Sequence, residues 1–199
     1  MSNTKLFIAI SRVIPLFLMT SVVVGMSAPY GWYAEGNLGS TRLINEDYPA
    51  NSSNSSSGLG GNINVGYKFM PYVGVELGYT RYANTTIDDQ NSTEAGSDKH
   101  YSYDLAGKGI IPIGTGNFEL FGKFGIQRIY SSISISNTTA ANNIGLGSGQ
   151  HSTTGYYLGV GGEYYFSPEF AAVAQWARAN GNSSTGTLDL YSVGVSYIF

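Results

Sequence analysis

The chain of 199 residues is long enough for one domain, and only 23 residues are charged, 10 basic and 13 acidic. This is about half the charged share of an ordinary soluble protein, while glycine and tyrosine are in excess. The net charge of −3 disfavours nucleic-acid binding, which needs clustered lysine and arginine, so no nucleic-acid partner is expected. The absence of cysteine excludes disulfide scaffolds, thiolate metal sites and cysteine nucleophiles.

The N-terminus has the pattern of a cleaved secretory signal. A positively charged start precedes residues 13–26, which are uncharged and mostly apolar, and the small residues Ser27 and Ala28 follow. This apolar stretch is too short for an ordinary transmembrane helix. We therefore expect a signal peptide over residues 1–27, with cleavage between positions 25 and 28, and one domain over residues 28–199. The alternative is an uncleaved anchor or a buried helix.

From Gly31 onward, apolar residues alternate with small or polar ones at period two, the pattern of a β-strand with two different faces. In the last segment Tyr191 and Val193 alternate with Ser192 and Gly194. No stretch shows a helical stripe. The pattern predicts eight strands, six clear and two weaker, over residues 32–38, 62–69, 73–80, 101–113, 118–127, 156–166, 170–176 and 191–199.

The connections between these strands alternate in length. Tight turns follow the second, fourth and sixth strands, at Met70 and Pro71, at residues 114–117 and at residues 167–169. Polar loops follow the first, third, fifth and seventh strands, over residues 40–59, 83–98, 131–152 and 180–186. Short turns at one end and longer loops at the other are typical of an outer-membrane barrel.

Charge placement separates a membrane barrel from a soluble, lipocalin-like barrel, which would show the same alternation. The charged residues within the strands all share a face with glycine, serine and asparagine, while aromatic residues gather near the strand ends of the opposite face, as lipid–water interfaces require. We therefore predict an all-β fold, an eight-stranded antiparallel up-and-down transmembrane β-barrel. The charges expected in its lumen are Glu35, Lys68, Glu76, Asp104, Lys108, Lys123 and Glu163.

These lumenal charges are the candidate functional network. Eight strands enclose a space just wide enough for side chains to fill, so the three lysines are expected to pair with the four acids. The network predicts a plugged lumen, and the alternative is a switchable gate for a narrow pore. Glu119, at a strand end, is expected to face water.

The last strand carries a second candidate site. The pattern formed by Ser192, Gly194, Tyr197 and Phe199 resembles the C-terminal assembly signal of bacterial outer-membrane proteins. An unfinished barrel has an open strand edge, which must be held before closure. We therefore expect the barrel-assembly machinery to bind this strand during insertion.

Together with GWYAEGNLG at residues 31–39 and SYDLAGKG at residues 102–109, the whole pattern resembles the eight-stranded outer-membrane barrels of Gram-negative bacteria, the OmpA-like transmembrane domain and opacity-protein group. The resemblance implies an integral outer-membrane protein of the porin family. It would contact lipid and lipopolysaccharide, with its loops extracellular and its short turns periplasmic. Full-length OmpA carries a peptidoglycan-binding domain after its barrel, whereas the resemblance covers only the barrel, which ends at Phe199. A wall-tethering role is therefore not implied.

Three functions fit such a barrel: a structural or adhesin-like role in which the loops meet a host or surface ligand, a narrow gated pore, and a lipid A-modifying enzyme. The enzyme requires a serine nucleophile beside a histidine. Related deacylases carry His-x-Ser, whereas this chain has His151, Ser152 and Thr153, and its other histidine is His100. We therefore expect no catalytic residue and no enzyme activity.

The sequence also predicts no cofactor and no metal ligands. The acidic pairs Glu46–Asp47 and Asp88–Asp89 fall in predicted loops and lack the spacing of a known calcium loop.

Overall fold

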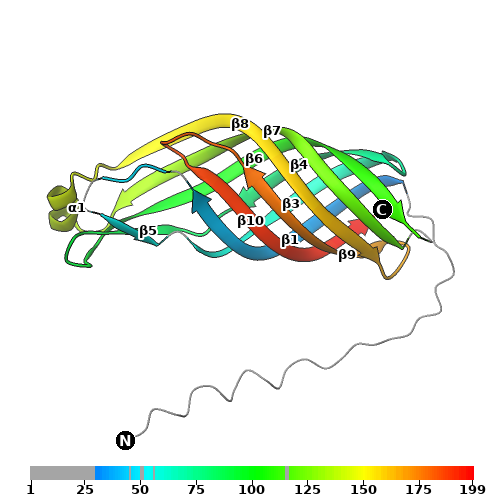
Figure 1. Ribbon diagram of the computed structural model, residues 1–199, viewed down its shortest axis with the longest axis horizontal. Helices are drawn as coiled ribbons and strands as arrows, with labels where there is room; N and C mark the ends of the chain where they lie inside the picture. The colour runs from blue at the N-terminus through cyan, green and yellow to red at the C-terminus, as the bar shows by residue number, and fades with distance from the viewer. Residues whose placement is uncertain (1–29, 45, 50–51, 56, 115–116) are drawn as a thin grey trace, which may run out of the picture.

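The computed structural model describes residues 30–44, 46–49, 52–55, 57–114 and 117–199 (Figure 1). The predicted signal peptide lies outside these residues. The dominant element is a closed barrel of eight antiparallel strands, as predicted. They are β1 (Gly31–Ile44), β3 (Ser57–Met70), β4 (Val73–Arg81), β6 (Glu94–Ile113), β7 (Phe118–Ile135), β8 (Gly149–Tyr165), β9 (Phe170–Ala179) and β10 (Thr187–Ile198).

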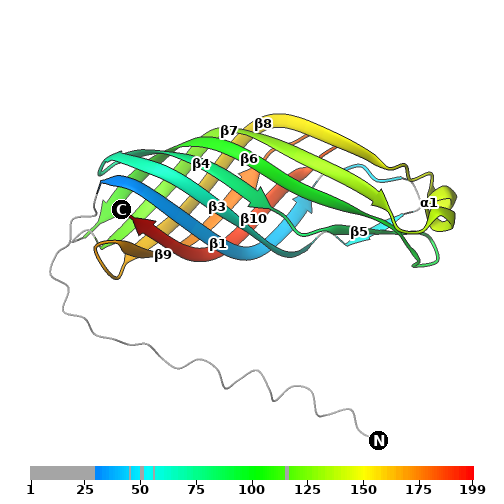
Figure 2. The same cartoon turned by 180° about the vertical axis from the view of Figure 1, so that it is seen from behind.

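Each barrel strand pairs with the strands before and after it in the chain, and β10 closes the barrel by pairing with β1. The closing register places Leu38 opposite Val193 and Ser40 opposite Tyr191. The two views of the molecule show β1 beside β10, with the C-terminus at one end of the barrel and α1 at the other (Figures 1 and 2). This is the up-and-down topology that the alternating connections predicted.

The barrel has its apolar side chains outside and its polar side chains inside. Leu77 and Val193 are 61% and 67% exposed, whereas Asn64 and Glu76 on the opposite face are fully buried. A soluble barrel would bury its apolar face, because exposing it to water costs about 25 cal/mol per Å². The inverted distribution is that of a barrel whose outer surface is solvated by lipid.

Tyrosines stack on the outer surface toward the α1 end of the barrel. The rings of Tyr101 and Tyr130 are 4.9 Å apart and nearly parallel, and Tyr79 and Tyr103 lie beside them. A second aromatic group lies at the opposite end, where Tyr197 packs 4.7 Å from the ring of Phe170. These two groups mark the two lipid–water interfaces.

Beyond the first interface the strands continue further than the sequence predicted. Strand β6 has 20 residues and β7 has 18, well above the 9 to 11 that cross a bilayer. The expectation of polar loops over residues 83–98 and 131–152 is therefore wrong for much of their length. Alternating residues such as Ile133 and Ile135 keep the hydrogen-bonded ladder of β7 running into water, paired with β6 up to Gly96.

Three short elements that the sequence did not predict cover this end of the barrel, which we call the extracellular end because the longer connections of such barrels face outward. Strand β2 (Ser53–Ser55) pairs with β5 (Thr85–Asp88), which pairs with the start of β6. Helix α1 (Thr138–Ile144) is capped by the side chain of Asn137 at its start and by Gly145, at φ 69°, at its end. The helix and its neighbours form a small apolar core of Ile87, Ala95, Ala140, Ala141, Ile144 and Leu146.

The described residues include no helix of the length and apolarity that crossing a membrane would require.

Candidate functional site in the lumen and at the extracellular mouth

The centre of the lumen holds two lysines that share one carboxylate. Lys123 Nζ lies 2.6 Å from Glu76 Oε1 and 3.5 Å from Glu35 Oε1. Lys108 pairs with Glu163, and its Nζ is 3.8 Å from Glu35 Oε2. All five residues are at least 97% buried. Because β1, β4, β6, β7 and β8 each contribute one member, these ion pairs span the barrel from wall to wall.

Amide and hydroxyl groups add hydrogen bonds to the same layer. Asn37 and Asn64 donate hydrogen bonds to Glu35 at 2.7 and 3.0 Å, and Gln175 accepts one from Lys123 at 3.0 Å. Tyr33 donates its hydroxyl hydrogen to Glu76 at 2.9 Å. Buried charges are tolerated when they are paired and hydrogen-bonded. Each of the five charged residues of this layer has an ion-pair partner, while Glu35 Oε2 makes no hydrogen bond among the described residues.

The third lysine pairs with a residue that the sequence reading had placed in water. Lys68 Nζ lies 2.7 and 2.8 Å from the two carboxylate oxygens of Glu119, which is 1% exposed. Tyr165 donates to Glu163 at 3.1 Å and contacts Glu119 at 3.3 Å, so it links this pair to the central layer. The expectation that Glu119 faces water is wrong. Side chains alternate between the two faces of β7, and Glu119 lies on the same lumenal face as Lys123, four residues later.

Asp104 is the lumenal charge that the structure does not bring into an ion pair. Its side chain is buried, yet neither carboxylate oxygen has a hydrogen-bond partner among the described residues. It lies against Gly78, where a β-carbon would come within 2.5 Å of Asp104 Oδ1. The predicted network therefore contains six of its seven expected members, joined by Glu119.

The arginines have the opposite placement to the barrel lysines. In the described part of the chain, all four arginines alternate with buried residues and lie on the outer surface near the extracellular aromatic group. The guanidinium groups of Arg128 and Arg178 lie 5.5 and 5.4 Å from the rings of Tyr130 and Trp176. Arg178 is also held by two hydrogen bonds to Asp189. The outward basic residues, which we call the basic belt, are Arg42, Arg81, Lys99, Arg128 and Arg178.

Arg81 borders two grooves on this outer surface. An open groove of about 850 Å³ is lined by Leu38, Leu59 and Ile63, with Arg81 at its edge. A second, more polar groove of about 330 Å³ is lined by Arg81, Lys99 and His151. The belt was not part of the sequence prediction, although its members could have been found as charges on the apolar face at the strand ends.

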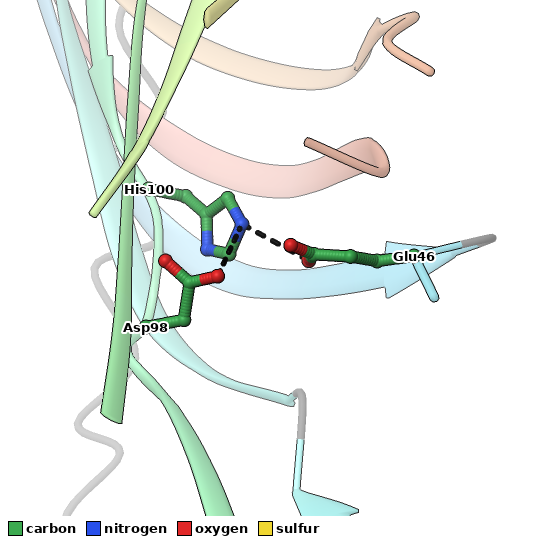
Figure 3. Close-up of side chains that lie close together, drawn as sticks. All are labelled: Glu46, Asp98 and His100. Atoms are coloured by element: carbon green, nitrogen blue, oxygen red, sulfur yellow. Dashed lines mark ion pairs between the residues drawn. The ribbon is translucent and has the colours of Figure 1, made fainter. Parts of the chain in front are cut away.

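A separate cluster lies at the extracellular mouth, beyond the aromatic group. His100 Nε2 is 3.1 Å from Glu46 Oε2 and 3.6 Å from Asp98 Oδ2 (Figure 3). Asp98 and His100 come from β6, and Glu46 comes from the segment after β1. Burial raises the pKa of the Asp98 carboxyl to about 6. The His100 side chain is buried.

The sequence and the fold agree with known proteins. Residues 16–199 match the family described as "Outer membrane protein beta-barrel domain". The chain belongs to this family. It is also 30% identical over 213 residues to Outer membrane protein A of Salmonella typhi, an alignment covering 100% of this chain and 56% of that protein. The chain thus spans little more than half the length of this curated relative.

Three solved outer-membrane proteins share the fold at low identity. OprG of Pseudomonas aeruginosa superposes with a TM-score of 0.61 at 14% identity, covering 89% of this chain and 99% of OprG. Neisserial surface protein A superposes with a TM-score of 0.59 at 15% identity, covering 85% of this chain and 97% of that protein. Ail of Yersinia pestis superposes with a TM-score of 0.55 at 17% identity, covering 86% of this chain and 100% of Ail. These likenesses show the fold, and the family match over residues 16–199 confirms the predicted family and localisation: this is an integral outer-membrane barrel protein.

In this outer-membrane barrel the last strand, β10, pairs with β9 at one edge and with β1 at the other. Gly194 lies so close to β1 that a β-carbon would meet Gly36 O at 2.0 Å. The backbone N–H of Phe199 donates to Trp32 O at 3.0 Å, while its side chain is 65% exposed on the lipid face. Ser192 is buried on the lumenal side, and Tyr197 faces lipid.

The residues considered for catalysis do not form a nucleophile and base pair. Ser152 accepts a hydrogen bond from Arg128 Nη2 at 3.0 Å, and Ser131, the residue across from both His100 and His151, donates to Asp98. A serine nucleophile would instead need to donate to a histidine nitrogen.

Proposed function

We propose that this outer-membrane barrel is a non-conducting protein with a structural and surface-interaction role, plugged in its lumen and active through its extracellular end. The observation that carries the proposal is the central lumenal layer, in which Glu35 contacts both Lys108 and Lys123. An ion crossing the barrel would have to separate these pairs in a site from which water is excluded. Separation of buried ion pairs is costly, so the resting barrel is closed.

The basic belt supports an anionic surface ligand. Its side chains lie beside the extracellular aromatic group, at the depth where phosphates of an outer leaflet would lie, and Arg81 joins an apolar groove to a polar one. Lipopolysaccharide offers acyl chains for the first groove and phosphates for the second. Ail, which shares the fold, has been crystallised with the heparin analogue sucrose octasulfate, another polyanion. We propose that the two belt residues lining these grooves, Arg81 and Lys99, bind lipopolysaccharide.

The test is binding of fluorescent lipopolysaccharide to the detergent-folded protein. Replacing Arg81 and Lys99 together with glutamine should weaken binding by about tenfold or more, since hydrogen bonds to charged groups contribute about 1.5 to 3 kcal/mol each. Arg42→Gln is the matched control, because Arg42 faces outward but lines neither groove. Equal losses in both variants would mean that the grooves do not position the ligand.

A narrow gated pore is the second candidate, and Asp104 favours it. This buried carboxylate lies in the lumen with no hydrogen-bond partner among the residues that the structure describes, so it offers the lumenal lysines an alternative position. If Lys123 moved toward Asp104, Glu76 would lose its close partner while Asp104 gained one, so the central layer could open without raising the number of unpaired acids. Single-channel recording separates the two candidates: a plugged barrel gives no current steps, whereas a gated pore gives brief ones.

We also propose that Ser192, Gly194, Tyr197 and Phe199 form the signal read by the barrel-assembly machinery. Deleting Phe199 should leave periplasmic, protease-sensitive protein, while the variant refolded in detergent should keep nearly its full unfolding free energy. The reason is that the Phe199 side chain is exposed, so the deletion removes little packing and one backbone hydrogen bond, to Trp32 O. Cell fractionation and urea titration measure the two effects. Normal outer-membrane yield of the deletion would refute the assignment.

A further inference from the structure

We propose that Glu46, Asp98 and His100 form a binding site for a divalent transition-metal cation such as Zn²⁺ at the extracellular mouth of the barrel. One imidazole and two carboxylates are a donor set that zinc uses in proteins. The residues are far apart in sequence and are brought together by the packing of the segment after β1 against the start of β6 (Figure 3).

The spacing of the donor atoms fits a shared cation. Bonds of about 2.0 to 2.1 Å in a tetrahedral zinc site place neighbouring ligand atoms about 3.3 Å apart. His100 Nε2 lies 3.1 Å from Glu46 Oε2 and 3.6 Å from Asp98 Oδ2, on either side of that value. All three donors lie within 4.8 Å of one another. A cation could bind them without large movement, with water as a fourth ligand.

The imidazole of His100 is an unpartnered group aimed into this cluster. The residue is 2% exposed, and neither ring nitrogen makes a hydrogen bond within the described residues. Glu46 Oε2 and Asp98 Oδ2 are both close to His100 Nε2, yet neither forms a hydrogen bond with it. A buried histidine is otherwise expected to have a hydrogen-bond partner.

Charge balance also points to a cation. Two buried carboxylates meet here, and in the described part of the chain neither forms an ion pair with a lysine or arginine. A divalent cation with neutral His100 would make the cluster neutral, whereas a protonated His100 leaves one negative charge uncompensated.

The outer contacts hold the carboxylates in place. Tyr48 donates to Glu46 at 2.8 Å, and Ser131 donates to both oxygens of Asp98 at 2.9 Å. Such partners orient metal ligands in known sites. Because Glu46 belongs to a segment without regular structure, the cation would fasten that segment to the wall formed by β6.

The experiment is a titration of the full chain, folded in detergent, with Zn²⁺ alone by isothermal calorimetry. We expect saturable binding of one ion per barrel and, with Co²⁺, the visible absorption of a tetrahedral site. Glu46→Gln and His100→Gln should each weaken binding at least about 100-fold, since even loss of an outer-shell contact costs 10- to 100-fold. His151→Gln is the matched control, because His151 is the other histidine and is exposed.

The outcomes are distinct. Wild-type affinity in His151→Gln with loss in the other two variants supports the site. No saturable binding to the wild type, or equal loss in His151→Gln and His100→Gln, overturns it. Because the cluster lies beyond the membrane, we expect all variants to keep the folded barrel, and the gel mobility of unheated samples checks this. If a variant does not fold, Asp98→Asn takes its place in the same comparison.

Discussion

Replacing Lys123 with methionine is expected to lower the free energy of unfolding by about 3 to 5 kcal/mol, the usual effect of removing one partner of a buried ion pair. The substitution leaves Glu76 and Glu35 facing each other without their shared cation, and it also removes a hydrogen bond to Gln175. Lys108→Met should act in the same way through Glu163. If water enters to solvate the stranded carboxylates, the barrel should begin to conduct.

Urea titration in detergent and single-channel recording measure the two effects. Lys99→Met is the control, because Lys99 is exposed on the outer side of β6 and forms no ion pair in the described part of the chain. An exposed lysine contributes about 0 to 1 kcal/mol. If Lys99→Met and Lys123→Met lower stability equally, the lumenal lysines do not hold the barrel closed.

The faces of the strands could be predicted from sequence because alternation at period two fixes which side of a strand each residue occupies. Lys68, Lys108 and Lys123 were assigned to the lumen on that basis, and all three are buried there. Their partners could not be predicted. Which acid meets which lysine across the lumen depends on the stagger of the strands around the barrel, and this stagger sets Lys68 beside Glu119.

The extracellular end was harder to predict, because its contacts are distant in sequence. Helix α1 has a capping residue at Asn137 and a terminating glycine at Gly145, so its local signal was present but short. The cluster of Glu46 and His100 had no local signal. The two residues meet only because β1 and β6 extend past the membrane interface.

Placing arginine at Val193 is expected to destabilise the barrel by about 2 to 4 kcal/mol, because the guanidinium group would enter the hydrocarbon layer. Val193 is 67% exposed on the lipid face and lies between the aromatic residues Tyr191 and Tyr197 of the same strand. Urea titration of the barrel in lipid vesicles measures the change in unfolding free energy.

Ser40→Arg is the control for depth. Ser40 lies opposite Tyr191 and two residues before Arg42 on the same outward face, so an arginine there can place its charge among the headgroups, where the cost is about 0 to 1 kcal/mol. Lumenal Ser192 would be a poor control, because it is buried and an arginine would displace its neighbours. Equal destabilisation at Val193 and Ser40 would mean that the hydrocarbon layer is not centred between the two aromatic groups, and the basic belt would then lie too deep to meet phosphates.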